Sequence, residues 1–145
     1  MNEIIDKRVY KSLIISFSLT ILLFIFSLFF NGYYINDGED SIGSLGIIAL
    51  LLGFFGMNIS WLANPCLILS LIHLKRENLQ KAFIFSLFSV VFGLSFLFYD
   101  QIIADEGGTK AEITGYGLGY WLWLSSLIVN FIGMVIIKQA IKKYG

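Results

Sequence analysis

The chain has 145 residues, of which 57% are hydrophobic and 14% are charged, and its formal net charge is zero. A soluble domain of this size needs more polar surface, so the composition indicates an integral membrane protein with one domain over residues 1–145. The lack of a basic excess argues against nucleic acid as a partner. The single cysteine, Cys66, excludes an internal disulfide and a C-x-x-C redox pair.

The first apolar run covers about residues 12–30 and follows the basic residues Lys7, Arg8 and Lys11. It is longer than the core of a secretory signal and no small-x-small cleavage site follows, so we expect a retained membrane span. Small polar residues recur at helical spacing and predict the face that contacts other helices, because small side chains let backbones approach. They are Ser12, Ser16, Thr20, Ser27 and Asn31.

The longest apolar run is residues 45–74, and as one helix it would reach roughly 45 Å, well beyond the ~30 Å hydrocarbon core. Pro65 lacks an amide hydrogen and crowds the carbonyl one turn earlier. The sequence therefore predicts one long second helix with a kink at Asn64-Pro65. In the alternative, Ile47–Phe55 lies along the outer membrane interface and the true span begins near Gly56.

The third apolar run, about residues 82–99, carries another side of mostly small residues that ends in a carboxylate at the membrane edge. Its members are Ser86, Ser89, Gly93, Phe96 and Asp100. For Asp100 two interpretations stay open, a water-facing residue at a helix end and a proton or cation site at a pore mouth.

The fourth run, about residues 120–137, opens with aromatic residues of the kind that lie at headgroup level. Asn130 lies near its middle, where an unpaired amide in lipid would be costly, so we expect it to hydrogen-bond to another helix. Asn58 and Asn64 on the second span are the expected partners. These three amides are the candidate polar contacts inside the bundle.

The two loops that separate the spans, residues 31–44 and 100–115, are acidic. The first lacks EF-hand spacing, so we favour a solvated loop over a calcium site and predict no metal site in the chain. The candidate outer-surface contacts are Asp37, Glu39, Asp40, Asp100, Asp105 and Glu106.

The distribution of basic residues predicts the orientation. Nine of the ten Lys and Arg residues lie in the two tails and in the connector from Lys75 to Lys81, and Lys110 alone lies in an outer loop. By the positive-inside rule both termini and this connector face the cytoplasm. An even number of spans agrees with that arrangement.

The expected span interiors contain no Asp, Glu, Lys or Arg. The one histidine, His73, is expected at the cytoplasmic end of the second span, on the opposite side of the membrane from Asp100, so the two cannot form a catalytic pair. We therefore predict a protein that is not an enzyme and binds no cofactor. A membrane enzyme acting on lipid or quinone through His73 is the minor alternative.

Two stretches, Trp61-Leu62-Ala63-Asn64-Pro65 and Gly119-Tyr120-Trp121-Leu122-Trp123-Leu124-Ser125-Ser126, resemble small uncharacterised bacterial inner-membrane proteins with four spans. The resemblance implies the bacterial inner membrane and no particular activity.

The expected fold is an all-α, integral membrane four-helix bundle. The expected function is contact with an unknown membrane or periplasmic protein, as an accessory, sensor or immunity-type subunit. The alternative is a small channel or transporter, and in either case the chain is a candidate homo-oligomer. A channel would require Asn58, Asn64, Asn130 and Asp100 to converge on one wet cavity.

Overall fold

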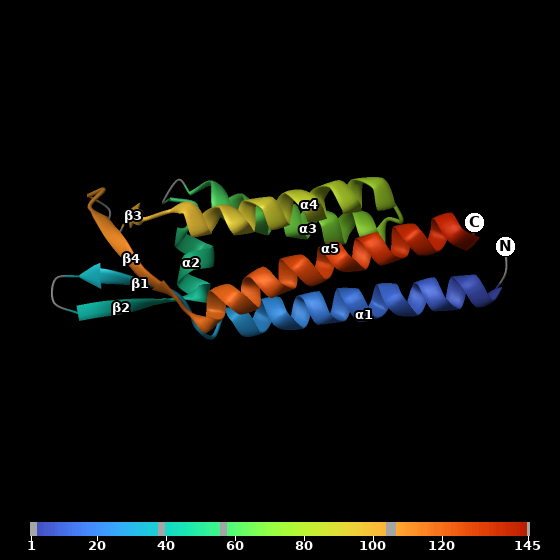
Figure 1. The fold of residues 1–145 in the computed structure, drawn as a ribbon, viewed down its shortest axis with the longest axis horizontal. Helices are drawn as coiled ribbons and strands as arrows, with labels where there is room; N and C mark the ends of the chain where they lie inside the picture. The colour runs from blue at the N-terminus through green and yellow to red at the C-terminus, as the bar shows by residue number, and fades with distance from the viewer. Residues whose placement is uncertain (1–2, 38–39, 56–57, 104–106, 145) are drawn as a thin grey trace.

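The long helices lie side by side and a small sheet caps one end of them (Figure 1). The computed structural model describes residues 3–37, 40–55, 58–103 and 107–144. Within these ranges the α-helices are α1 (Glu3–Ser27), α2 (Gly46–Leu52), α3 (Ala63–Lys75), α4 (Leu79–Ser95) and α5 (Leu118–Tyr144). Two short 3-10 helices, η1 (Ile59–Leu62) and η2 (Phe96–Phe98), precede α3 and follow α4. α1 packs along α5, α5 along α4, and α4 along α3, while α2 lies across the others next to the sheet.

The two acidic segments that were predicted as loops form a four-stranded antiparallel sheet among the described residues. Its strands are β1 (Asn31–Asp37), β2 (Asp40–Leu45), β3 (Gln101–Ile103) and β4 (Lys110–Tyr116), in the order β2-β1-β4-β3. β1 pairs with β4, so that Tyr33 lies opposite Tyr116. This pairing joins the loop after α1 to the loop before α5. The prediction of an all-α four-helix bundle is therefore wrong, because the fold is mixed α and β.

The sheet has one solvated face and one face packed on the helices. On β4 the exposed residues are Lys110, Glu112 and Thr114, and the half-buried ones are Ala111, Ile113 and Gly115. This period of two is what a strand with one wet face requires. On the inner side, the ring of Phe96 lies 5.5 Å from that of Tyr33 and 5.8 Å from that of Tyr116. Aromatic packing therefore fastens the sheet to the end of α4.

Residues 45–74 do not form one kinked helix, so the predicted long second helix is also wrong. Gly53 ends α2, and a separate helical segment begins with η1 and continues as α3. Pro65 is the third residue of α3, in the first turn, where amide hydrogens have no acceptor within the helix and proline is tolerated. The alternative of a separate Ile47–Phe55 segment agrees with the position of α2, whereas its span start at Gly56 lies outside the described residues.

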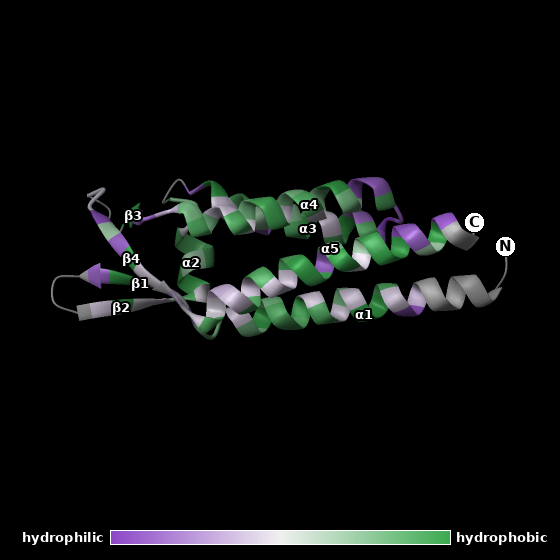
Figure 2. Cartoon of the chain, viewed as in Figure 1, coloured by the Kyte–Doolittle hydropathy of each residue, from purple (hydrophilic) through white to green (hydrophobic). Residues whose placement is uncertain are grey.

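Among the described residues, three helices are long and apolar enough to cross a membrane, and they cover Tyr10–Ser27, Leu79–Phe98 and Leu118–Lys142. The segment Ile59–Lys75 is apolar but shorter. Large apolar side chains such as Leu22 and Phe88 cover the outside of the helices. Figure 2 shows apolar residues along the helix shafts and hydrophilic ones at the sheet and at the opposite end. An apolar exterior along the shafts is what lipid requires.

The start of α1 and the end of α5 lie away from the sheet (Figure 1). The turn between α3 and α4 lies toward the same end of the molecule, opposite the sheet. That turn carries Lys75, Arg76 and Lys81. The described chain thus runs to the sheet along α1, back along α3, to the sheet again along α4, and back along α5.

The small residues of α1 pack against α5. Ser16, Thr20 and Ser27 are buried. The Ser16 hydroxyl donates to the Val129 carbonyl over 3.4 Å, and a Cβ atom at Gly133 would collide with Ser16. The close approach of these two helices therefore depends on small side chains on both.

The predicted side of α4 is buried from Ser86 to Phe96. The hydroxyls of Ser86 and Ser89 donate to carbonyls of their own helix at 2.7 Å instead of bonding to a neighbouring helix. Their contribution to the interface is thus small size, with the polar atom satisfied locally.

Candidate functional site

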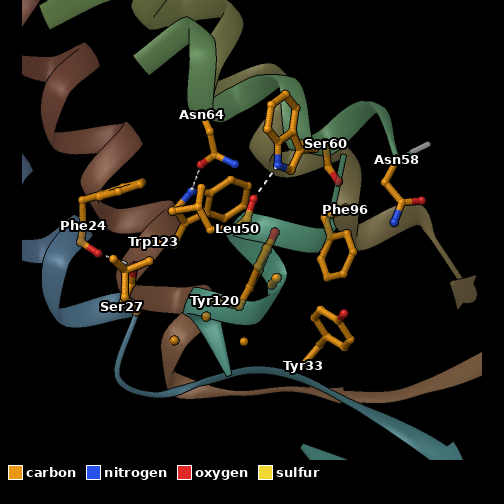
Figure 3. A pocket seen from close by; sticks show the side chains of 17 residues that line it. Phe24, Ser27, Tyr33, Leu50, Asn58, Ser60, Asn64, Phe96, Tyr120 and Trp123 are labelled. Atoms are coloured by element: carbon orange, nitrogen blue, oxygen red, sulfur yellow. Dashed lines mark hydrogen bonds between the residues drawn. The ribbon is translucent and has the colours of Figure 1, made fainter. Parts of the chain in front are cut away.

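A pocket of about 100 Å³ lies under α2, where that helix meets the sheet ends of α1, α3 and α5 (Figure 3). We call it the α2 pocket. The lining residues that matter for its chemistry are Ala49, Asn58, Ser60, Asn64, Tyr120 and Trp123. It exists because α2 crosses the gap between the α1 and α3 ends instead of extending α3.

Two tryptophan indoles hold the walls of the pocket together. Trp61 Nε1 donates to the Leu50 carbonyl at 2.8 Å, which ties α2 to η1. Trp123 Nε1 donates to Asn64 Oδ1 at 2.9 Å, which ties α5 to α3. Figure 3 draws both bonds. Asn64, one of the predicted bundle contacts, is therefore an interhelical hydrogen-bond acceptor at the pocket wall.

The wall of the α2 pocket also carries donors without a protein acceptor. Within the described ranges, no hydrogen bond pairs Asn64 Nδ2 or the Ser60 hydroxyl, although Asn64 is only 6% exposed and Ser60 only 5% exposed. Neither atom is itself completely buried, so both open onto the pocket, where a ligand or water can accept their hydrogen bonds. Asn58, a second predicted contact, lines the same pocket. The pocket wall therefore offers two hydrogen-bond donors to whatever group occupies the pocket.

The α2 side of the pocket is made of small residues. Gly46, Ala49 and Gly53 recur every three or four residues, so they share one face of the helix, and Leu50 completes it. The neighbouring Ile48 and Leu51 point away and are exposed. A Cβ atom at Gly46 would collide with the Ser27 carbonyl and one at Gly53 with Trp61, so these glycines let α2 pack closely against residues that line the pocket.

Asn130 lies away from the pocket, deeper among the helices. Its Nδ2 donates to Ser70 Oγ at 2.9 Å, and Ser70 in turn donates to the Ala82 carbonyl at 2.9 Å. Asn130 Oδ1 and Thr20 Oγ1 are buried and have no hydrogen-bond partner among the described residues. The structure thus gives Asn130 a partner on α3, but this partner is Ser70 instead of Asn58 or Asn64. Two of the three predicted amides line the pocket and the third does not.

Only part of the predicted acidic surface falls within the described side chains. Asp100 is exposed where η2 passes into β3. Asp37 and Asp40 pair through their backbones at the end of the β1–β2 hairpin, and their side chains are not described. The candidates Glu39, Asp105 and Glu106 lie outside the described residues.

Tyr116 links the Asp100 region to the aromatic cluster. Its hydroxyl donates to the Phe96 carbonyl over 3.3 Å. Burial raises the pKa of the Tyr116 phenol, and the negative charge of Asp100 raises it further. The phenol therefore stays protonated and able to donate this bond at neutral pH.

The remaining titratable candidate, His73, stacks flat on Phe85, with ring centroids 5.5 Å apart and an angle of 1° between the rings. It lies near the end of α3 remote from Asp100. In the part of the chain that the structure describes, no group of three His, Cys, Asp or Glu residues is placed to hold a metal ion.

Sequence reasoning missed most of the pocket wall. The available signal was the spacing of Gly46, Ala49 and Gly53, which marks one small-residue face within an otherwise bulky apolar run. No family model, curated protein or solved structure matches this chain. The α2 pocket and the four-stranded sheet are therefore the two features from which a function can be inferred.

Proposed function

We propose that the chain is a bacterial inner-membrane protein that crosses the bilayer four times and keeps both termini in the cytoplasm. The path of the chain supports an even number of crossings, because α1 begins and α5 ends on the side opposite the sheet. The fourth crossing is then Ile59–Lys75, which runs from the sheet end to the Lys75–Lys81 turn. The concentration of Lys and Arg at that turn and in the tails supports the cytoplasmic assignment.

In this orientation the sheet lies outside the cytoplasm, and we propose that it binds another membrane or periplasmic protein without catalysing a reaction. One observation carries the proposal. Two loops far apart in the sequence fold into a single sheet whose outer strands, β2 and β3, each have one neighbour among the described strands. A free strand edge offers a row of amide and carbonyl groups to which a partner strand can add.

The exposed side chains of the two edges fit such an interface. Ile42 on β2 is 48% exposed and Ile103 on β3 is 39% exposed. Side chains of this kind supply the apolar contact that accompanies strand addition. We propose an accessory, sensor or immunity-type role, because each of these requires only contact with a partner protein.

A channel or transporter is the alternative that we do not favour. A channel requires the four polar residues named above to converge on one water-filled cavity. Asn58 and Asn64 line the α2 pocket, but Asn130 lies apart from it, and Asp100 is exposed at the outer surface.

Site-specific photo-crosslinking in intact cells tests the contact proposal. A photoreactive benzophenone amino acid replaces Ile42 or Ile103, and the matched control carries it at Phe88, which is 47% exposed on α4. We expect both edge positions to yield an adduct with the same extracytoplasmic protein, while the Phe88 position does not. An Ile42→Pro exchange, which removes a backbone donor from β2, should abolish the Ile42-side adduct when the probe is moved to Ser44.

Two outcomes would contradict the proposal. One is the absence of any protein adduct from both edges in cells that express the protein at its natural level. The other is an adduct of twice the monomer mass as the sole product, which would make the edge a contact between copies of this chain.

A further inference from the structure

We propose that the α2 pocket binds the ester group of a membrane phospholipid from the leaflet at the sheet end. In this arrangement the ester carbonyl accepts hydrogen bonds from Asn64 Nδ2 and the Ser60 hydroxyl, and the first methylenes of the acyl chain lie on the small-residue face of α2. The inference concerns a different part of the molecule from the sheet edges and goes beyond the proposed contact function.

The donors of the pocket define the chemistry of the ligand. Asn64 Oδ1 is already occupied by Trp123, so the amide is fixed with its Nδ2 free. Figure 3 shows this nitrogen pointing away from Trp123. Ser60 adds a hydroxyl that is equally buried. An acceptor such as a carbonyl oxygen satisfies both groups, whereas a purely apolar ligand would leave them unpaired.

The lining of the pocket excludes a charged ligand group. None of the described residues that line it is Asp, Glu, Lys, Arg or His. A phosphate or an ammonium group placed here would be a buried charge without a counter-charge, which is strongly unfavourable. The ligand group is therefore a neutral acceptor, and the aromatic rings of Phe96, Tyr120 and Trp123 favour an apolar extension of it.

The position of the pocket brings it level with the esters of the bilayer. It lies where α5 begins, beside Tyr120, Trp121 and Trp123, and aromatic residues with polar tips mark the membrane interface. The ester groups of a phospholipid lie at this boundary between the headgroups and the hydrocarbon core. A lipid can thus place its ester in the pocket without leaving the bilayer.

The size of the pocket sets how much of the lipid enters it. A cavity needs roughly 10–15 Å³ of probe-occupied volume to hold one water molecule, so a pocket of about 100 Å³ has room for several such groups. That is enough for one ester group and the first methylenes of an acyl chain. The rest of the lipid stays in the bilayer, where the exposed Ile48 and Leu51 of α2 meet it.

Native mass spectrometry of the full chain, released from nanodiscs, measures the bound lipid. The nanodiscs contain equal amounts of an ester-linked diacyl phosphatidylglycerol and its ether-linked dialkyl analogue, which have the same headgroup and chain length. We expect one tightly retained lipid per chain, with the ester form retained about five- to tenfold over the ether form, because the ether lacks the carbonyl acceptor.

Two pairs of variants locate the bound lipid. Ala49→Phe fills the pocket from α2 and should abolish retention, whereas the matched Ile48→Phe, one residue away and 44% exposed, should leave it unchanged. Ala49→Leu is a milder filling variant in case the phenylalanine form does not fold. Ser60→Ala should reduce the ester preference at least twofold. The control Ser126→Ala should not, since that hydroxyl is already bonded to the Trp123 carbonyl at 2.6 Å.

Three results would overturn the proposal. They are the loss of all lipid from the native protein, equal retention of the ester and ether lipids, and retention by both Ala49 variants at the native level in folded protein. Equal retention of the two lipids would indicate that water, and not the ester carbonyl, accepts the hydrogen bonds of Asn64 and Ser60. None of these results depends on the crosslinking outcome at Ile42 or Ile103, so the two proposals fail separately.

Discussion

Asn130 shows how one side chain joins three helices. Its amide on α5 bonds to Ser70 on α3, and Ser70 bonds to the Ala82 carbonyl on α4. Asn130→Leu should lower the free energy of unfolding in detergent by roughly 0.5–1.5 kcal/mol, the range for hydrogen bonds between membrane helices. Thermal unfolding followed by circular dichroism measures the loss.

A double-mutant cycle separates this bond from a simple loss of packing. If the bond carries the effect, Asn130→Leu should destabilise the Ser70→Ala protein less than it destabilises the native one. Ser126→Ala on the same helix provides a control that leaves the bond intact. Strictly additive effects of the two substitutions would contradict the assignment.

Tyr116 makes stability depend on pH at the alkaline end. Burial and then the charge of Asp100 raise the pKa of its phenol in the folded protein. The unfolded chain therefore ionises first, so the stabilisation is complete below the unfolded pKa of about 10 and is lost as the pH rises above it. The melting temperature should fall between about pH 9 and pH 11.

The Tyr116→Phe exchange tests the source of that fall. The alkaline decline should become shallower, because the group that resists ionisation is gone. Tyr10→Phe serves as the control, since Tyr10 is 65% exposed on α1. Identical profiles for the native and Tyr116→Phe proteins would show that another group is responsible.

At the scale of an element, α2 is too short to be stable alone. It has seven residues, none of them buried, and no side-chain cap at its amino end. Trp61→Phe removes the bond to the Leu50 carbonyl and should increase amide hydrogen exchange over residues 46–53 by about fivefold, from the loss of ~1 kcal/mol. Trp121→Phe, which changes a half-exposed indole on α5, should leave exchange in α2 unchanged.

The α1–α5 contact depends on a missing side chain. A Cβ at Gly133 would collide with Ser16, whereas a Cβ at Gly115 would meet nothing within 4 Å. Gly133→Ala should therefore push the helices apart and lower stability by about 1–3 kcal/mol, the usual range for overpacking. Gly115→Ala is the matched control and should melt like the native protein. Equal melting temperatures for the two variants would contradict the close contact.

For the whole molecule, the sidedness of the chain is open to direct measurement. In a Cys66→Ala background, single cysteines replace Glu112 on β4, Gln80 on α4 and Gln139 on α5, all of which are exposed. A membrane-impermeant maleimide should label position 112 in intact spheroplasts and positions 80 and 139 only after permeabilisation. Different behaviour at 80 and 139 would mean that Ile59–Lys75 does not cross.

Composition and hydropathy were sufficient to predict the three long apolar helices. The runs at about residues 12–30, 82–99 and 120–137 each contain most of a helix that is long and apolar enough to cross a membrane. Burial on one side of these helices follows small residues such as Ser16, Ser86 and Ser126, as helix packing in lipid requires. These properties are local, and so they can be read from short stretches of sequence.

The sheet was missed because what stabilises it is not local. Residues 110–114 alternate apolar and polar, and Asn36-Asp37-Gly38 is a hairpin signal. A single hairpin is marginal in water, however, and here the first one depends on pairing of β1 with β4. That partner lies more than two helices away in the sequence, where no local pattern indicates it.

The second span was misread for a related reason. Hydropathy treats residues 45–74 as one apolar run, but Gly53 ends α2 and Pro65 lies in the first turn of α3. The α2 pocket arises only from this break and from the fold of α2 back onto Trp61. A cavity is a property of how elements meet, so its residues were predictable only in part, as Asn58 and Asn64.

The pairing of β1 with β4 also sets an order for biogenesis. β1 leaves the ribosome long before β4, because about 70 residues separate Asp37 from Lys110; at 5–20 residues per second, roughly 4–15 s of synthesis pass between them. During that interval β1 has β2 on one side and nothing yet made on the other. The newborn hairpin therefore passes through a stage in which its inner edge is open to chaperones or to neighbouring nascent chains, and arrival of β4 closes it.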